Sequence, residues 1–139
     1  MRLVFDTNVV ASGLLWNGTS ARLIDAAQAD EIEIFTSRVL LAELTRILRR
    51  RKFAKAIAAS GLSLDELVLG YAEVAQLVQP ASIAPVVVTD PDDDHVLACA
   101  LAAQADLIVS GDPDLLNLKS YQHIPIVNPA EALTRLPQR

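Results

Sequence analysis

Short runs rich in Leu, Val, Ile and Phe alternate with helix-like segments along the whole chain. The runs predict strands over Arg2 to Phe5, Glu33 to Phe35, Pro85 to Val88, Leu107 to Val109 and Ile124 to Val127. The segments between and after them predict helices over Thr19 to Ala29, Ser37 to Arg51, Leu64 to Val78, Asp93 to Ala105 and Pro129 to Leu136. This alternation is typical of a parallel sheet that helices cover on both faces. We therefore predict an α/β fold, a three-layer α/β/α sandwich with a central parallel sheet of about five strands.

The composition indicates one compact globular domain. The chain has 139 residues, 52% of them hydrophobic, and no linker or repeat interrupts it, so we expect a single domain over residues 1–139. The lone Cys99 has no disulfide partner, which favours a reducing, cytoplasmic compartment. The longest apolar stretch, Val96 to Ala103, is far shorter than a membrane span, and the first residues do not resemble a signal peptide. No membrane is expected.

Acidic side chains follow three of the predicted strands. Asp6 follows the first, Asp90-Pro91-Asp92-Asp93-Asp94 follows the third, and Ser110-Gly111-Asp112-Pro113-Asp114 follows the fourth. Taken alone, each acid is more often a helix cap or a turn former than a catalyst, and capping or solvation is the first interpretation of Asp92 and Asp93. In open parallel sheets, however, ligands bind outside the carboxyl ends of the strands. The repeated acids therefore predict one shared site.

Glu43 lies within the apolar stripe of its predicted helix, three residues after Leu40 and four before Ile47. A carboxylate on a buried face is costly unless it is paired or binds a metal. A salt bridge to Arg38 or Arg46 is thus the alternative to a metal ligand.

Four carboxylates are expected to converge on one crevice. Asp94 opens its helix in register with the apolar face, and Glu43 lies in the apolar stripe of its own helix. Both carboxylates can therefore point toward the strand ends that carry Asp6 and Asp112. Such a group repels itself unless a divalent cation neutralises it. Oxygen ligands suit Mg²⁺ or Mn²⁺, which polarise a scissile phosphate and lower the pKa of an attacking water.

The order and spacing of these motifs match a known family. The matching segments are Leu3-Val4-Phe5-Asp6-Thr7-Asn8-Val9, Thr36-Ser37 with Leu41-Ala42-Glu43-Leu44, Asp90 to Ala98 with Ala105-Asp106, and Ser110-Gly111-Asp112-Pro113-Asp114-Leu115-Leu116. Over nearly its whole length the chain resembles a PIN-domain ribonuclease, of the VapC-like kind found as toxins in bacterial and archaeal toxin-antitoxin pairs.

The resemblance implies a metal site and a substrate. Its catalytic, metal-binding carboxylates around Mg²⁺ or Mn²⁺ would be Asp6, Glu43, Asp94 and Asp112. Asp93 and Asp114 are further candidate ligands, and Asn8 and Ser37 would be supporting polar groups. Three consecutive acids leave the third ligand open by one residue, and Asp94 is chosen for its helical register. The family also implies cleavage of single-stranded RNA, a homodimer, and silencing by a small antitoxin protein.

Three alternatives remain. A haloacid-dehalogenase-type phosphatase shares a late Gly-Asp motif such as Gly111-Asp112, but it needs a second Asp where Asn8 stands and a Lys at a strand end, whereas Lys52 and Lys55 lie in a basic helix tail. A receiver domain needs a Lys after the fifth strand, where Asn128-Pro129 stands. A non-catalytic RNA- or protein-binding PIN domain would be indicated by a missing site acid, and none is missing.

Half of the basic residues form one block after Glu43, namely Arg46, Arg49, Arg50, Arg51, Lys52 and Lys55. The block is interpreted either as a solvated helix end or as a clamp on RNA phosphates, and for the clamp we select Arg46, Arg49, Arg50, Arg51 and Lys52. Trp16 is assigned to base stacking, to the core or to a dimer interface. The mean hydropathy of +0.32 favours a further buried surface in a homodimer or with an antitoxin.

The net charge of −5 does not exclude an RNA partner. Eight of the 17 acids lie at the proposed site, and without them nine acids face 12 basic residues. These eight are Asp6, Glu43, Asp90, Asp92, Asp93, Asp94, Asp112 and Asp114.

Overall fold

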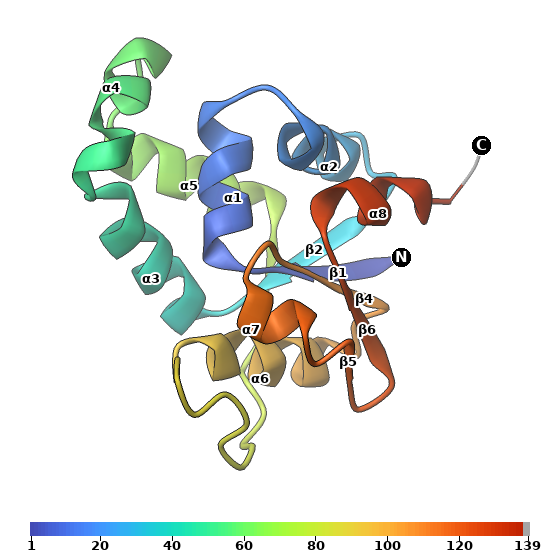
Figure 1. The fold of residues 1–139 in the computed structure, drawn as a ribbon. Coiled ribbons are helices and arrows are strands. Elements are labelled where there is room, and N and C mark those ends of the chain that lie inside the picture. Colours follow the sequence, from blue (N-terminus) through green and yellow to red (C-terminus); the bar gives the residue numbers. More distant parts are fainter. Residues whose placement is uncertain (138–139) are drawn as a thin grey trace.

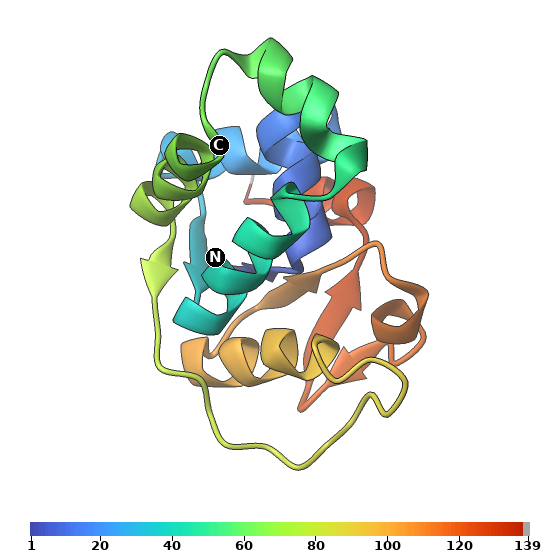
Figure 2. The ribbon, with the colours of Figure 1, turned by 90° about the vertical axis from the view of Figure 1, so that its left-hand side faces the viewer.

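A computed structural model, in which residues 1–137 are described, shows a six-stranded sheet between two layers of helices (Figures 1 and 2). The strands are β1 (Arg2–Phe5), β2 (Glu33–Thr36), β3 (Gln76–Leu77), β4 (Leu107–Val109), β5 (Ser120–Tyr121) and β6 (Ile124–Val127). They follow the order β3-β2-β1-β4-β6-β5, and each neighbouring pair is parallel except β5 with β6. The predicted α/β fold is confirmed, with one strand more than expected and an antiparallel edge.

The helices cover both faces because strand residues alternate between two hydrophobic cores. Leu3 and Phe5 of β1 belong to one core, whereas Val4 between them belongs to the other. The first core packs under α1, α2, α5 and α8, and the second packs under α6 and α7 on the opposite side (Figure 1). The helices are α1 (Thr7–Leu15), α2 (Thr19–Gln28), α3 (Arg38–Leu48), α4 (Arg51–Ser60), α5 (Leu64–Val74), α6 (Asp93–Ala103), α7 (Pro113–Leu116) and α8 (Pro129–Thr134). None of the helices in residues 1–137 combines the length and the apolarity that crossing a bilayer requires.

The helix predicted over Ser37 to Arg51 is two helices. Arg50 adopts an extended conformation, with φ −65° and ψ 143°, so α3 ends at Leu48 and α4 begins one residue after Arg50. The break turns the chain so that Phe53 packs into the first core. A uniform helical pattern in sequence cannot reveal such a turn, because the side chains on both sides of it favour helix.

The helix predicted over Leu64 to Val78 begins as expected and ends early. Ser63 and Glu66 form the capping box, each accepting the backbone N–H of the other at 3.1 and 3.0 Å. Ala75 is extended, and the chain then pairs with β2 as strand β3 instead of completing another helical turn.

The strand predicted over Pro85 to Val88 is wrong. The place beside β2 is taken by β3, and the N–H groups of Val86 and Val87 donate to the carboxylate of Asp94 at 3.1 and 2.9 Å. Val88 is 86% exposed. This segment is an irregular connection that runs around the outside of α6 (Figure 2).

The sheet has a topological switch point between β1 and β4. From β1 the chain proceeds outward to β2 and β3, whereas from β4 it proceeds in the other direction to β6. At this point the backbone N–H of Asp6 donates to the carbonyl of Val109 at 3.0 Å. Loops at the carboxyl ends of these two strands diverge and leave a crevice between them.

Candidate metal centre and adjoining cleft

Asp6 is the most firmly held acid of the crevice. It is the N-cap of α1, and its Oδ1 accepts the N–H of Asn8 at 2.7 Å. Its Oδ2 accepts the hydroxyl of Ser110 at 2.6 Å. Burial raises the pKa of Asp6, and the hydrogen bonds from Ser110 and Asn8 offset part of that rise. Capping and a site role are therefore compatible for this residue.

Ser110 connects the acids at the ends of β1 and β4. Its hydroxyl donates to Asp6 and accepts the N–H of Asp112 at 2.9 Å. Asp112 is in turn the N-cap of α7 and accepts the N–H of Asp114 at 2.9 Å. Ser110 was not among the predicted site residues. Its signal in the sequence was its position, as the first polar residue after a strand that is buried on both faces.

Of the two acids that open α6, Asp93 lies in the acidic cluster and Asp94, which was chosen from its helical register, does not. Single oxygens of Asp90, Asp93 and Asp112 all lie within 4.8 Å of one another. The carboxylate of Asp94 is engaged with the backbone of the segment after β3, as described above. Adjacent residues on a helix point about 100° apart, so only one of the two can face the end of β4.

One carboxylate oxygen of Asp93 is buried and makes no hydrogen bond within residues 1–137. Asp93 is 7% exposed, and its Oδ2 is buried without a hydrogen-bond partner among the described residues. Burial raises the pKa of Asp93, and a hydrogen bond shared with Asp112 and the charges of Asp112, Asp90 and Asp6 raise it further. A buried carboxylate oxygen without a hydrogen-bond donor fits a ligand of a divalent cation.

Glu43 reaches the same pocket from α3. It is buried, and its Oε1 lies 3.6 Å from Nη2 of Arg46, which also contacts Oδ2 of Asp92 at 3.1 Å. Burial and the charge of Asp92 raise the pKa of Glu43 to about 7, although Arg46 acts against this rise. The salt bridge considered from the sequence therefore exists with Arg46, and it leaves Glu43 lining the pocket. Arg38 lies on a different groove.

The acidic pocket has the donor set of a hard divalent cation. It is a small hollow of about 70 Å³ whose carboxylates come from four different segments: the end of β1 with Asp6, α3 with Glu43, the loop and first residue of α6 with Asp90, Asp92 and Asp93, and the loop after β4 with Asp112. Raised pKa values at Asp6, Glu43 and Asp93 show that the charged forms are disfavoured in this arrangement. An oxygen-bound Mg²⁺ or Mn²⁺ would reverse that penalty.

The remaining predicted residues divide into those that border the pocket and those that do not. Asn8 lines it. Ser37 is fully buried away from it and caps α3, accepting the N–H of Leu40 at 3.3 Å, so it supports the helix that carries Glu43. Asp114 is exposed and contacts Thr89 at 3.2 Å.

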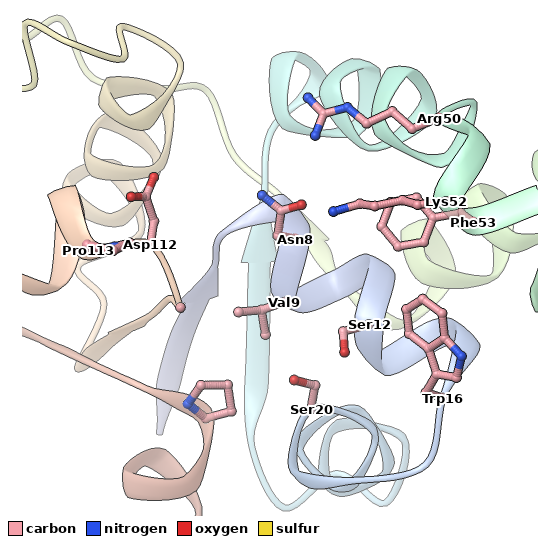
Figure 3. A pocket seen from close by; sticks show the side chains of 12 residues that line it. Asn8, Val9, Ser12, Trp16, Ser20, Arg50, Lys52, Phe53, Asp112 and Pro113 are labelled. Carbon is pink, nitrogen blue, oxygen red and sulfur yellow. The ribbon is translucent and has the colours of Figure 1, made fainter.

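The basic block is also divided. Arg46 and Arg50 line the acidic pocket, and Arg50 and Lys52 line a larger cleft of about 550 Å³ beside it (Figure 3). Arg49 and Arg51 are exposed and border neither hollow.

A model of the PIN domain family matches residues 2–114. Comparison with curated proteins and with solved structures gave no match. PIN domains are generally metal-dependent nucleases, and the acidic cluster described above has the ligands that such a metal needs. Because the match spans most of the chain and all of the acidic pocket, the protein belongs to the PIN-domain family.

Proposed function

We propose that this protein is an endoribonuclease that cleaves single-stranded RNA with Mg²⁺ or Mn²⁺ held in the acidic pocket. The observation that carries the proposal is the buried Oδ2 of Asp93, which has no donor and lies among acids that repel it. A purely structural site would neutralise or hydrogen-bond such an oxygen.

Each side chain has a distinct part in this proposal. The carboxylates that would hold the cation are Asp6, Glu43, Asp90, Asp93 and Asp112. A divalent cation bound there supplies polarisation of the phosphodiester and a lowered pKa for the attacking water. Ser110 orients Asp6 and the backbone of Asp112, while the cations of Arg50 and Lys52 bind phosphates of the RNA backbone.

Two adjacent, isosteric substitutions test the proposal. Asp93→Asn removes a proposed ligand, and we expect it to lower Mn²⁺ affinity in calorimetry by at least roughly 10- to 100-fold and to abolish RNA cleavage. Asp94→Asn keeps the pocket, so it should retain metal binding and cleavage even if the loss of its charged contacts to Val86 and Val87 lowers stability. Asp6→Asn provides an independent loss of activity. Metal-dependent cleavage at the wild-type rate by both Asp93→Asn and Asp6→Asn would refute the assignment.

The proposal extends to a toxin of a toxin-antitoxin pair, acting in the cytoplasm as a homodimer and silenced by a small antitoxin. The support is the resemblance of the motifs around Asp6, Glu43 and Asp112 to such toxins. Expression of the wild-type chain should arrest growth, expression of Asp6→Asn should not, and co-expression of a small protein from the neighbouring reading frame should restore growth. Light scattering of the purified chain tests the dimer. The phosphatase alternative is not carried forward, because the family match is to the PIN domain.

A further inference from the structure

The larger cleft opens directly beside the acidic pocket. It lies between α1, the start of α2, the start of α4 and the loop after β4, and its volume of about 550 Å³ is within the roughly 300–1,000 Å³ of small-molecule sites. Asn8, Arg50 and Asp112 border both hollows. A molecule bound in the cleft is therefore next to whatever the acids hold.

One wall of the cleft is an aromatic pair. Trp16, at the end of α1, is 47% exposed, and its ring centroid lies 5.6 Å from that of Phe53 with the ring planes tilted by 40°. Phe53 is buried in the first core, so it is a rigid support against which the indole of Trp16 packs. An exposed tryptophan on a fixed support presents a surface for stacking.

Cations lie between the aromatic pair and the acids. The side chains of Arg50 and Lys52 extend into the cleft between Trp16 and Asp112 (Figure 3). Within residues 1–137 neither cation is within salt-bridge distance of a carboxylate, and Nζ of Lys52 lies 5.0 Å from the ring centroid of Phe53. The hydroxyl-bearing residues Ser12 and Ser20 also line the cleft. The surface thus offers stacking, positive charge and polar groups together.

We propose that this cleft is a nucleotide subsite of the RNA-binding surface. The indole of Trp16 stacks on the base of a nucleotide beside the scissile bond, and Arg50 and Lys52 bind its phosphate. The inference rests on the proposed nuclease function, because the acids define where the scissile bond lies. An apolar protein segment would match Trp16 but would leave two unneutralised cations beside it, whereas a nucleotide matches both features.

The chain contains a single tryptophan, so its fluorescence reports on this cleft alone. A short, single-stranded 2′-O-methyl RNA is titrated in the presence of Mg²⁺, with a gel to verify that it stays intact. We expect saturable quenching of Trp16 emission, and an abasic oligonucleotide of the same length should bind more weakly without quenching. Trp16→Ala should weaken binding of a labelled RNA, followed by anisotropy, roughly five- to a hundredfold, and Trp16→Phe should retain most of the affinity.

Lys52→Gln and Lys55→Gln form a matched pair that leaves the core intact. Both remove one positive charge from the exposed face of α4, but only Lys52 borders the cleft. Lys52→Gln should weaken RNA binding severalfold more than Lys55→Gln. This comparison still tests the proposal if Trp16→Ala fails to fold.

Several results would overturn the subsite while leaving the nuclease in place. One is metal-dependent RNA cleavage by a protein whose Trp16 emission does not change when RNA is added, and whose Lys52→Gln variant binds RNA as tightly as Lys55→Gln does. Another is emission that shifts with protein concentration as a dimer forms and not with RNA, which would assign the cleft to a second copy. Conversely, if RNA quenches the Trp16 emission saturably but the protein cleaves no RNA with any divalent metal, the subsite is upheld and the nuclease function is refuted.

Discussion

Glu43→Gln should stabilise the metal-free protein at alkaline pH while impairing metal binding. The pKa of Glu43 rises from 4.5 to about 7 because its charged form is buried beside Asp92. The folded protein therefore binds this proton more tightly than the unfolded chain, and stability is fully present below pH 4.5 and lost as the pH rises through about 7. At about 1.4 kcal/mol per pKa unit, the whole shift corresponds to about 3 kcal/mol. Glutamine has no charge to bury and avoids this loss.

The loss of the ion pair between Glu43 and Arg46 does not cancel the gain in stability. The side chain of Arg46 is 61% exposed, and exposed pairs contribute about 0–1 kcal/mol. Integrated between pH 5.5 and pH 8, the advantage of Glu43→Gln over the wild type should grow by about 2 kcal/mol. Urea unfolding in EDTA at the two pH values measures it. Glu73→Gln, on the exposed face of α5, is the control and should follow the wild type at both.

Bound metal should make the wild type more stable than Glu43→Gln, the reverse of the order expected in EDTA. A ligand that binds only the folded state stabilises it, so Mg²⁺ should raise the stability of the wild type more than that of Glu43→Gln at pH 8. If Glu43→Gln and the wild type lose the same free energy of unfolding between pH 5.5 and pH 8 in EDTA, burial of the Glu43 charge is not the cause of the shift, and the reasoning fails.

Two further predictions concern positioning and packing. Ser110→Ala removes the hydrogen bond to the buried carboxylate of Asp6, which should cost about 1.5–3 kcal/mol in urea unfolding and lower Mn²⁺ affinity by roughly 10- to 100-fold in calorimetry; wild-type values in both measurements would remove Ser110 from the site. Gly13→Ala places a Cβ 2.6 Å from Cδ1 of Ile24, whose side chain can rotate away, and 3.0 Å from the backbone carbonyl oxygen of Ser20, so the backbone of α2 must move by a few tenths of an ångström and the melting temperature should fall. Gly70→Ala, with no atom within 4 Å of the new Cβ, should instead stabilise α5 by up to about 1 kcal/mol, and equal melting temperatures for the two variants would contradict the packing argument.

The sequence by itself determined the architecture and the place of the site. Alternating short strands and helical patterns predict the parallel sheet, because only crossover connections join parallel neighbours. Acids after successive strands predict where the carboxylates meet, and Asp6 and Asp112 do lie together at the switch point. The burial of Glu43 follows from its place in an apolar stripe. These features depend on local periodicity, which a chain carries in its order of residues.

The tertiary structure decided which side chains face the pocket. Asp93 and Asp94 cannot be separated by pattern, since α6 is buried on several sides and has no polar face that marks its rotation. The choice is made by the path of the irregular segment before α6, whose two N–H groups at Val86 and Val87 donate to Asp94, while Asp93 lies beside Asp112, which comes from the loop after β4. The break at Arg50 likewise brings Lys52 and Phe53 beside Trp16, which lies more than thirty residues earlier in the chain. Such juxtapositions depend on packing between segments remote in sequence, and packing is a property of the folded chain alone.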